Sequence, residues 1–313
     1  MKSIARKTLS VFVVVLTLVS AFFGRVYDDA GDVYAASKKS TENTDDKSGE
    51  KTIKDFLETA LKPVGTTMYI YGGGWNEEDT GAGTEARTIG LSPKWEEFAK
   101  KQTSSYNHKS YDYKKDVSVI HLGLDCSGYA GWALYNVLET ENDKPGYVDY
   151  YNRVLEKLQT SGYGSLKMSP KVTDYKPGDI MKNDDHMWIV IGSCDDGSVV
   201  LVHSSPPGVQ ISGTATPSGV KNSKANTLAT YYMKKYYYDW YKRYPDSSRG
   251  SSYLSGYNQF RWNGKKGLKD TEKYLQKSAV QVLEDIFGTR PAGFTDASEG
   301  TTDSKSGEWK KNS

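Results

Sequence analysis

Two short apolar runs rich in valine and isoleucine predict neighbouring β-strands. They are HMWIVIG at 186–192 and VVLVHSS at 199–205, and the turn-forming sequence SCDDGS separates them. YKPGDIM at 175–181 predicts a turn leading into another strand, because proline and glycine interrupt regular structure. Two further strands are predicted by TTMYIYGGGW at 66–75, which ends in a glycine turn, and by YNQFRWN at 257–263.

Apolar residues in other parts of the chain recur with the spacing of a helix. From Cys126 onward they fall at Ala130, at Ala133 and Leu134, and at Val137 and Leu138, which lie on one helical face. Similar patterns predict helices from Ile53 to the break at Pro63, and at Pro93–Lys101, Tyr147–Gln159, 228–244 and Leu268–Phe287.

The N-terminus has the pattern of an export signal. The positively charged MKSIARK precedes an uncharged run of 16 residues at 9–24, which is shorter than the roughly 20 residues of a membrane span. Val33–Ala35 offers a cleavage site, so we predict a signal peptide at 1–35, with an uncleaved anchor as the alternative. A flexible linker is predicted at 36–52 and a loose tail beyond Arg290, because both are polar.

Charge and cysteine content narrow the classes of function. The net charge of +2 comes without a dense run of lysine and arginine, so no nucleic-acid partner is expected. Two cysteines cannot hold together a chain of 313 residues, so the core must be hydrophobic and either cysteine can serve chemistry.

Cys126 lies where a predicted helix begins. The N-terminus of a helix favours an anion, and a cysteine acts as a nucleophile only in its thiolate form. A histidine nearby could take the thiol proton. Of the four histidines, His186 and His203 lie in the two predicted strands, and a four-residue loop at Ser193–Asp196 would place them directly opposite each other.

These residues also have less specific interpretations. A cysteine at a helix start is often a small buried residue, and a histidine in an apolar strand is often a hydrogen-bonded core residue. Cys126, His186 and His203 could bind zinc together with Asp125, although the sequence lacks a closely spaced ligand pair such as Cys-x-x-Cys.

Five segments occur in an order that resembles the NlpC-like cell-wall peptidases, a family of papain-like cysteine enzymes. They are YIYGGGW, LDCSGYAGWALY, YKPGDI, HMWIVIG and VLVHSS, and the resemblance runs from about Ile53 to Trp262. It implies an α+β, papain-like fold in which a central helix bearing the nucleophile packs on an antiparallel β-sheet. The peptidase domain is then expected at 53–265, with an insertion at about 77–116 and a C-terminal extension at 266–313.

The resemblance also implies roles for single residues. Cys126 is expected to be the nucleophile and His186 the general base, which His203 orients. The positions that match family residues around the substrate are Tyr71, Asp125 and Ser127, the last two of which hold the amine of the substrate peptide in some members.

The function implied by the resemblance is that of an exported peptidoglycan hydrolase. It would cut the γ-D-glutamyl–diamino acid bond of stem peptides through a thioester, with no metal or other cofactor. The expected partners are stem peptides, without nucleic acid and without a membrane after signal cleavage, and the expected location is extracellular and associated with the cell wall. Nothing in the pattern predicts an oligomeric state.

Two alternatives stay open at this level. A related N-acetylmuramoyl-L-alanine amidase would share the cysteine and histidine chemistry. A non-catalytic wall-binding module would use the aromatic segment Tyr231–Tyr244 for stacking on sugars, although aromatic residues at helical spacing more often pack in a core. The gap between YGGGW and DCSG is longer than in compact family members. The expected roles of Tyr71, Asp125 and Ser127 therefore depend on how the inserted residues shape the substrate cleft, whereas the roles of the three catalytic residues do not.

Overall fold

The chain divides into two units, and the computed structural model describes residues of the second. The units are Met1–Gly49 and Glu50–Ser313, and the described residues are 50–74, 90–138 and 153–294. The predicted signal peptide at 1–35, most of the predicted linker, part of the predicted insertion at 77–116 and the tail beyond Phe294 lie outside the described residues. No helix among the described residues is long and apolar enough to span a membrane.

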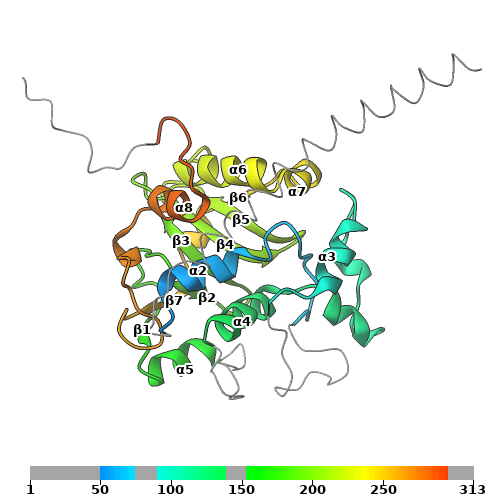
Figure 1. Ribbon diagram of the computed structural model, residues 1–313, viewed down its shortest axis with the longest axis horizontal. Helices are drawn as coiled ribbons and strands as arrows, with labels where there is room; N and C mark the ends of the chain where they lie inside the picture. The colour runs from blue at the N-terminus through cyan, green and yellow to red at the C-terminus, as the bar shows by residue number, and fades with distance from the viewer. Residues whose placement is uncertain (1–49, 75–89, 139–152, 295–313) are drawn as a thin grey trace, which may run out of the picture. The chain divides into compact units, whose positions relative to one another are not determined.

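A seven-stranded β-sheet packed against helices organises the described part of the chain (Figure 1). The strand order is β1-β7-β2-β3-β4-β5-β6, and all neighbouring strands are antiparallel except β5 and β6, which are parallel. The expectation of an α+β protein with an antiparallel sheet is therefore confirmed at this level. The strands are β1 (Gly164–Lys167), β2 (Ile180–Lys182), β3 (Met187–Ser193), β4 (Val199–Ser205), β5 (Gly208–Thr214), β6 (Ser248–Arg249) and β7 (Asn258–Trp262).

Four of the described α-helices, α2, α4, α6 and α8, begin after a side chain that accepts a hydrogen bond from their free N–H groups. Thr52 and Ser278 each form a capping box, and Pro93 occupies the first position of its helix. The α-helices are α2 (Ile53–Leu61), α3 (Pro93–Lys100), α4 (Cys126–Val137), α5 (Val154–Thr160), α6 (Lys224–Tyr236), α7 (Tyr238–Arg243) and α8 (Ala279–Phe287). Short 3-10 helices are η2 (His108–Ser110), η3 (Val117–Leu122), η4 (Ser251–Leu254) and η5 (Tyr274–Gln276).

Three predicted elements differ from the structure, and for the two helices among them the reason is a local break in the backbone. The helix predicted at 228–244 is divided into α6 and α7, because Tyr237 leaves the helical conformation at φ −131° and ψ 45°. The helix predicted at Leu268–Phe287 is confirmed only for α8, because Lys273 has a left-handed φ of 57° and Ser278 caps a new start. The strand predicted at 66–75 is reduced to isolated bridges of Met68 to Gly123 and to Gly208.

The two faces of the sheet are buried by different parts of the chain. In β3, Ile189 and Ile191 point into the main core with the helices, whereas Trp188 and Val190 point into a smaller cluster. This alternation is the period of two expected of a strand. The smaller cluster is covered by residues from loops and from η4 rather than by a long helix: Val172, Tyr175, Tyr253 and Leu254.

The C-terminal segment belongs to the same core as the sheet. Leu268, Tyr274, Val282 and Leu283 are fully buried in it. At Gly192 of β3, a Cβ atom would lie 2.7 Å from the backbone of Ala279, so α8 and β3 are in close backbone contact. The strand that follows His186 therefore packs directly against α8.

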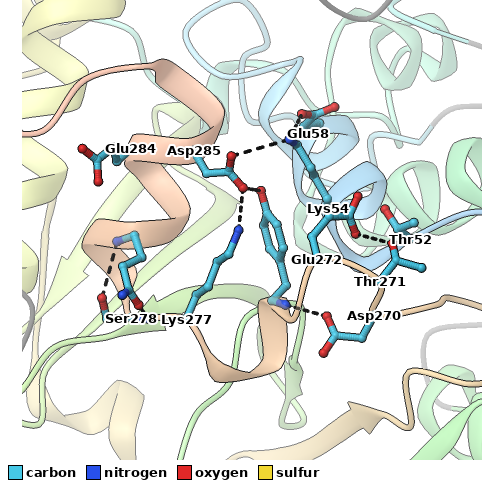
Figure 2. A network of polar contacts seen from close by, with 12 residues as sticks. Thr52, Lys54, Glu58, Asp270, Thr271, Glu272, Lys277, Ser278, Glu284 and Asp285 are labelled. Atoms are coloured by element: carbon cyan, nitrogen blue, oxygen red, sulfur yellow. Dashed lines mark hydrogen bonds and ion pairs between the residues drawn. The ribbon is translucent and has the colours of Figure 1, made fainter. Parts of the chain in front are cut away.

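A polar network joins the segment around α8 to α2 (Figure 2). Asp285 accepts hydrogen bonds from Tyr274 Oη at 2.7 Å and from Lys277 Nζ at 2.6 Å. Its other carboxylate oxygen forms an ion pair with Lys54 of α2 at 3.6 Å. These contacts lower the pKa of Asp285, although its partial burial acts in the opposite direction. The first and last described helices are thus connected through one carboxylate.

Candidate active site

Cys126 is the first residue of α4, so the helix start predicted there is confirmed. The helix is capped by Asp125, whose Oδ1 accepts hydrogen bonds from the Gly128 N–H at 2.6 Å and from Ser127 Oγ at 2.8 Å. The thiol is therefore beside the free N–H groups of the first helical turn. Cys126 is partly buried and is a free thiol, as is Cys194.

The two strand histidines are in direct contact. His186 Nε2 lies 2.9 Å from His203 Nδ1, and the two rings are 5.1 Å apart between centroids. His186 immediately precedes β3, and His203 lies within β4. The sequence-based expectation that these two residues meet across the hairpin is confirmed.

The predicted register of this hairpin is wrong by two residues. Ile189 pairs with Val202 rather than with Val200, and a bulge shifts the pairing again between Val190 and Gly192. The turn lies further along the chain than predicted, because the Cys194 N–H bonds to the Ser198 carbonyl at 2.8 Å and leaves three residues between them. Side chains alternate with a period of two, so a shift of two residues keeps both histidines on one face and makes them diagonal neighbours.

The cysteine and the histidine pair meet at the beginning of β3. The backbone N–H of Met187, the residue after His186, hydrogen-bonds to the Cys126 sulfur and acts to lower the thiol pKa. α4 packs on β3 and β4, the two strands that carry the histidines. The structure therefore brings all three predicted catalytic residues, Cys126, His186 and His203, to one place.

Burial dominates the protonation of these groups. It raises the pKa of the Cys126 thiol to about 11, and the nearby Asp125 carboxylate adds to this effect. Burial, assisted by the positive charge of Arg249, lowers the pKa of His186 to about 4. Burial and the charge of Arg249 also lower the pKa of His203, and the neighbouring His186 lowers it further. These shifts favour an uncharged thiol and two uncharged imidazoles at neutral pH.

The residues expected around the substrate have different surroundings. Tyr71 is exposed, at 59% of its surface, and its ring lies 5.8 Å from that of Tyr113. Ser127 is partly buried and donates to the Asp125 carboxylate. Burial raises the pKa of Asp125, opposed by the N–H and O–H groups that its carboxylate accepts. Asp125 thus serves α4 as a cap in addition to any role towards substrate.

Two tyrosines near the site were not singled out from the sequence. The Tyr253 ring packs edge-on against both His186 and His203, with centroids 5.7 and 5.8 Å away. Burial raises the pKa of Tyr69, and its electrostatic interaction with Cys126 raises this pKa further. Tyr69 lies in the same glycine-turn segment as Tyr71, so the sequence motif that pointed to Tyr71 could also have pointed to Tyr69. Tyr253 lies in η4, far along the chain from Cys126, and only the tertiary fold brings it here.

Arg249 is a third residue that the sequence did not indicate. Its Nε donates to His203 Nε2 at 3.2 Å, and its side chain is 12% exposed. The guanidinium also hydrogen-bonds to the Tyr253 side chain and to the Ser248 carbonyl. It is the only arginine contact to the histidine pair found among the described residues.

The zinc alternative finds no support in the side-chain arrangement. Within 50–74, 90–138 and 153–294, the His, Cys, Asp and Glu side chains form no group of three or more suited to a metal ion. The aromatic residues of α6 are occupied in packing: Tyr232 and Tyr236 stack at 6.0 Å and contact Phe287 of α8. This arrangement favours packing over sugar stacking for these two rings.

Comparison with known proteins gives no relative for this chain. No family model, no curated protein and no solved structure matches it.

Proposed function

We propose that this chain is an exported cysteine endopeptidase that cuts stem peptides of peptidoglycan at the γ-D-glutamyl–diamino acid bond, with a papain-like arrangement of helix and sheet. One observation carries the proposal: a histidine pair joined at 2.9 Å lies beside a cysteine at the first position of a helix. The order of sequence segments that resembles the NlpC-like peptidases supplies the substrate class.

The proposed reaction begins with transfer of the Cys126 proton to His186. The sulfur attacks the γ-D-glutamyl carbonyl, and N–H groups in the first turn of α4 stabilise the oxyanion. Protonated His186 then gives its proton to the amine of the diamino acid, which leaves as the C–N bond breaks and a thioester remains. Water attacks the thioester while His186 accepts the water proton, and the products are a carboxylate and the free thiol.

The test uses purified cell walls and three proteins: the parent, Cys126→Ala and Cys194→Ser. We expect the parent and Cys194→Ser to release peptides with new γ-D-glutamyl termini and new diamino-acid amines, identified by mass spectrometry. Cys126→Ala should keep its fold and release nothing above background, because the nucleophile is gone. Circular dichroism checks the fold of each variant.

Other products would contradict the proposal in distinguishable ways. Release of intact stem peptides with a free L-alanine amine would indicate the amidase reaction instead. Binding to walls without any cleavage by the parent would indicate a binding module. Peptide release by Cys126→Ala at the parental rate would remove the thiol from the mechanism.

A further inference from the structure

His203 Nε2, the ring nitrogen that faces away from His186, accepts a hydrogen bond from the positively charged side chain of Arg249. Arg249 Nε donates to His203 Nε2 at 3.2 Å, and Ser212 Oγ lies at the same distance from that nitrogen. An arginine guanidinium is always protonated and can only donate. His203 Nε2 must therefore be the unprotonated nitrogen of a neutral ring.

This contact determines where the protons of both histidines lie. A neutral His203 without a proton on Nε2 carries it on Nδ1, and Nδ1 lies 2.9 Å from His186 Nε2. His203 is then the donor in this bond and His186 Nε2 the acceptor. A neutral His186 must in turn carry its own proton on Nδ1, the nitrogen left for the thiol.

In this arrangement His186 cannot act as a base towards Cys126. Its Nδ1 already bears a proton, and its Nε2 lone pair is used by His203. To accept the thiol proton, His186 needs its proton on Nε2, which requires His203 to accept at Nδ1 and to carry its own proton on Nε2. Ser212 Oγ could accept that Nε2 proton, but the Arg249 N–H occupies the same position.

We propose that Arg249 is a positioning residue that holds the histidine pair in a non-basic proton arrangement, and that the site becomes competent when the guanidinium leaves His203 Nε2. The Tyr253 side chain and the Ser248 carbonyl already hydrogen-bond to Arg249 and can keep it nearby after it moves. The inference rests on the proposed function in that it takes His186 to be the base for Cys126.

The other charged and titratable groups around the pair come from several elements. Asp246 lies 4.0 Å from the Arg249 guanidinium and can stabilise it in either position. Tyr253 of η4 packs on both imidazoles, and Cys126 with Asp125 lies at the start of α4. Burial is the largest cause of the lowered pKa of both His186 and His203, and the positive charge of Arg249 is the next.

The first experiment determines the protonated nitrogens directly. Nitrogen NMR of the imidazole rings distinguishes a protonated ring nitrogen from an unprotonated one, and assignment uses His186→Gln and His203→Asn. In the parent at about pH 7, where an unperturbed histidine is mostly neutral, we expect His203 to be protonated on Nδ1 and not on Nε2. In Arg249→Met the proton of His203 should move to Nε2. A parent protein with His203 protonated on Nε2 would overturn the proposal without any variant.

The second experiment measures how fast iodoacetamide alkylates Cys126, in a Cys194→Ser background so that one thiol reacts. Without Arg249, His186 can accept the thiol proton, and the reactive thiolate becomes more populated. We expect Arg249→Met to be alkylated roughly tenfold faster at neutral pH, as a change of about one pKa unit gives. Lys242→Gln, which removes a positive charge from an exposed position of α7, is the matched control and should match the parent.

The outcomes separate this proposal from the proposed function. Equal alkylation rates in the parent and a folded Arg249→Met protein contradict the role of Arg249, whatever the peptidase assay gives. A faster alkylation and a shifted His203 proton support it even if no wall peptide is released, in which case the proposed substrate is wrong. If Arg249→Met does not fold, the NMR spectrum of the parent alone decides.

Discussion

At the scale of single residues, the hydrogen bonds of the two ring nitrogens of His203 determine its role at this site. His203 is fully buried, and each of its ring nitrogens has one or more polar partners: His186 on one side, Arg249 and Ser212 on the other. A buried ring held at both nitrogens cannot rotate without losing hydrogen bonds. It therefore fixes the orientation of the His186 ring, which is the task of the third residue in a catalytic triad.

An orienting residue needs a correctly placed polar group rather than an imidazole. We expect His203→Asn to keep a measurable part of the hydrolytic rate on wall peptides, because its amide can still hydrogen-bond to His186 Nε2. His186→Ala should lose almost all of it, at least about a hundredfold, because the general base is gone. The measurement is kcat/KM for both variants on one soluble stem peptide. Equal and complete loss in two folded variants would show that His203 takes part in proton transfer itself.

Asp125 gives a prediction about the end of the substrate that lies nearest the helix start. If its carboxylate also pairs with the free amine of a stem peptide, that contact contributes roughly 1.5–3 kcal/mol, or about 10- to 100-fold in preference over an N-acylated peptide. Asp125→Asn should abolish the preference while keeping the helix cap, because asparagine also caps well. The measurement is kcat/KM for a free and an acylated tetrapeptide.

The pH dependence of this preference has a defined sign. Burial raises the pKa of Asp125, so the carboxylate is lost, and the preference with it, as pH falls through that raised value. Equal rates on both peptides at neutral pH would contradict the role of Asp125 and would favour an enzyme that acts on the intact wall.

At the level of the elements, backbone contacts place the helix that carries the cysteine. A Cβ atom on Gly128 would lie 2.1 Å from the Gly73 carbonyl oxygen, and the Asp125 N–H bonds to that same oxygen at 3.0 Å. A glycine is therefore required at position 128 for α4 to approach the backbone of the glycine turn this closely.

Gly128→Ala should separate these segments and displace the start of α4. We expect a loss of about 1–3 kcal/mol in the free energy of unfolding, as is usual for overpacking. We also expect the folded protein that remains to have a lower rate of peptide release than the parent. Gly250→Ala is the control, because its Cβ would have ordinary contact with Ser252 Oγ at 3.6 Å. Thermal unfolding and peptide release are measured for both. A Gly128→Ala protein as stable and as active as the parent would show that the close approach is not needed.

The sequence predicted most of the elements near the site because their patterns are local. The helix start at Cys126 follows from apolar spacing, and the contact of His186 with His203 follows from two strands and a short loop. The register could not be predicted, because the turn hydrogen bonds at Cys194–Ser198 and the bulge in β3 have no distinct pattern. Tyr253 and Arg249 could not be found either, since their only relation to Cys126 is through tertiary structure.

At the level of the whole described unit, the C-terminal segment stabilises the strand that leads from His186. α8 packs on β3, and its side chains Val282 and Leu283 are fully buried. Burying one such side chain contributes about 1.5–3 kcal/mol, and a domain is stable by only about 5–15 kcal/mol. The fold therefore depends on residues beyond the part of the chain in which the family resemblance was found.

Two truncations test this dependence. A chain that ends at Lys265 lacks η5 and α8, and we expect it to be unfolded or aggregated and to lose all activity. A chain that ends at Phe294 lacks only residues beyond the described part and should keep the parental melting temperature and activity. Circular dichroism melting curves and peptide release provide the comparison. A folded, active chain ending at Lys265 would show that the contacts of α8 contribute little.

The raised thiol pKa has a consequence for the chemical lifetime of the protein. Oxidants such as peroxides attack the thiolate, and the later oxidation products of cysteine are irreversible. Burial keeps Cys126 protonated, with a pKa raised to about 11, so the thiolate is scarce until the histidine pair rearranges. If the protein is an exported enzyme as proposed, it would be oxidised slowly while idle, and oxidative damage would be limited to the time it spends turning over substrate.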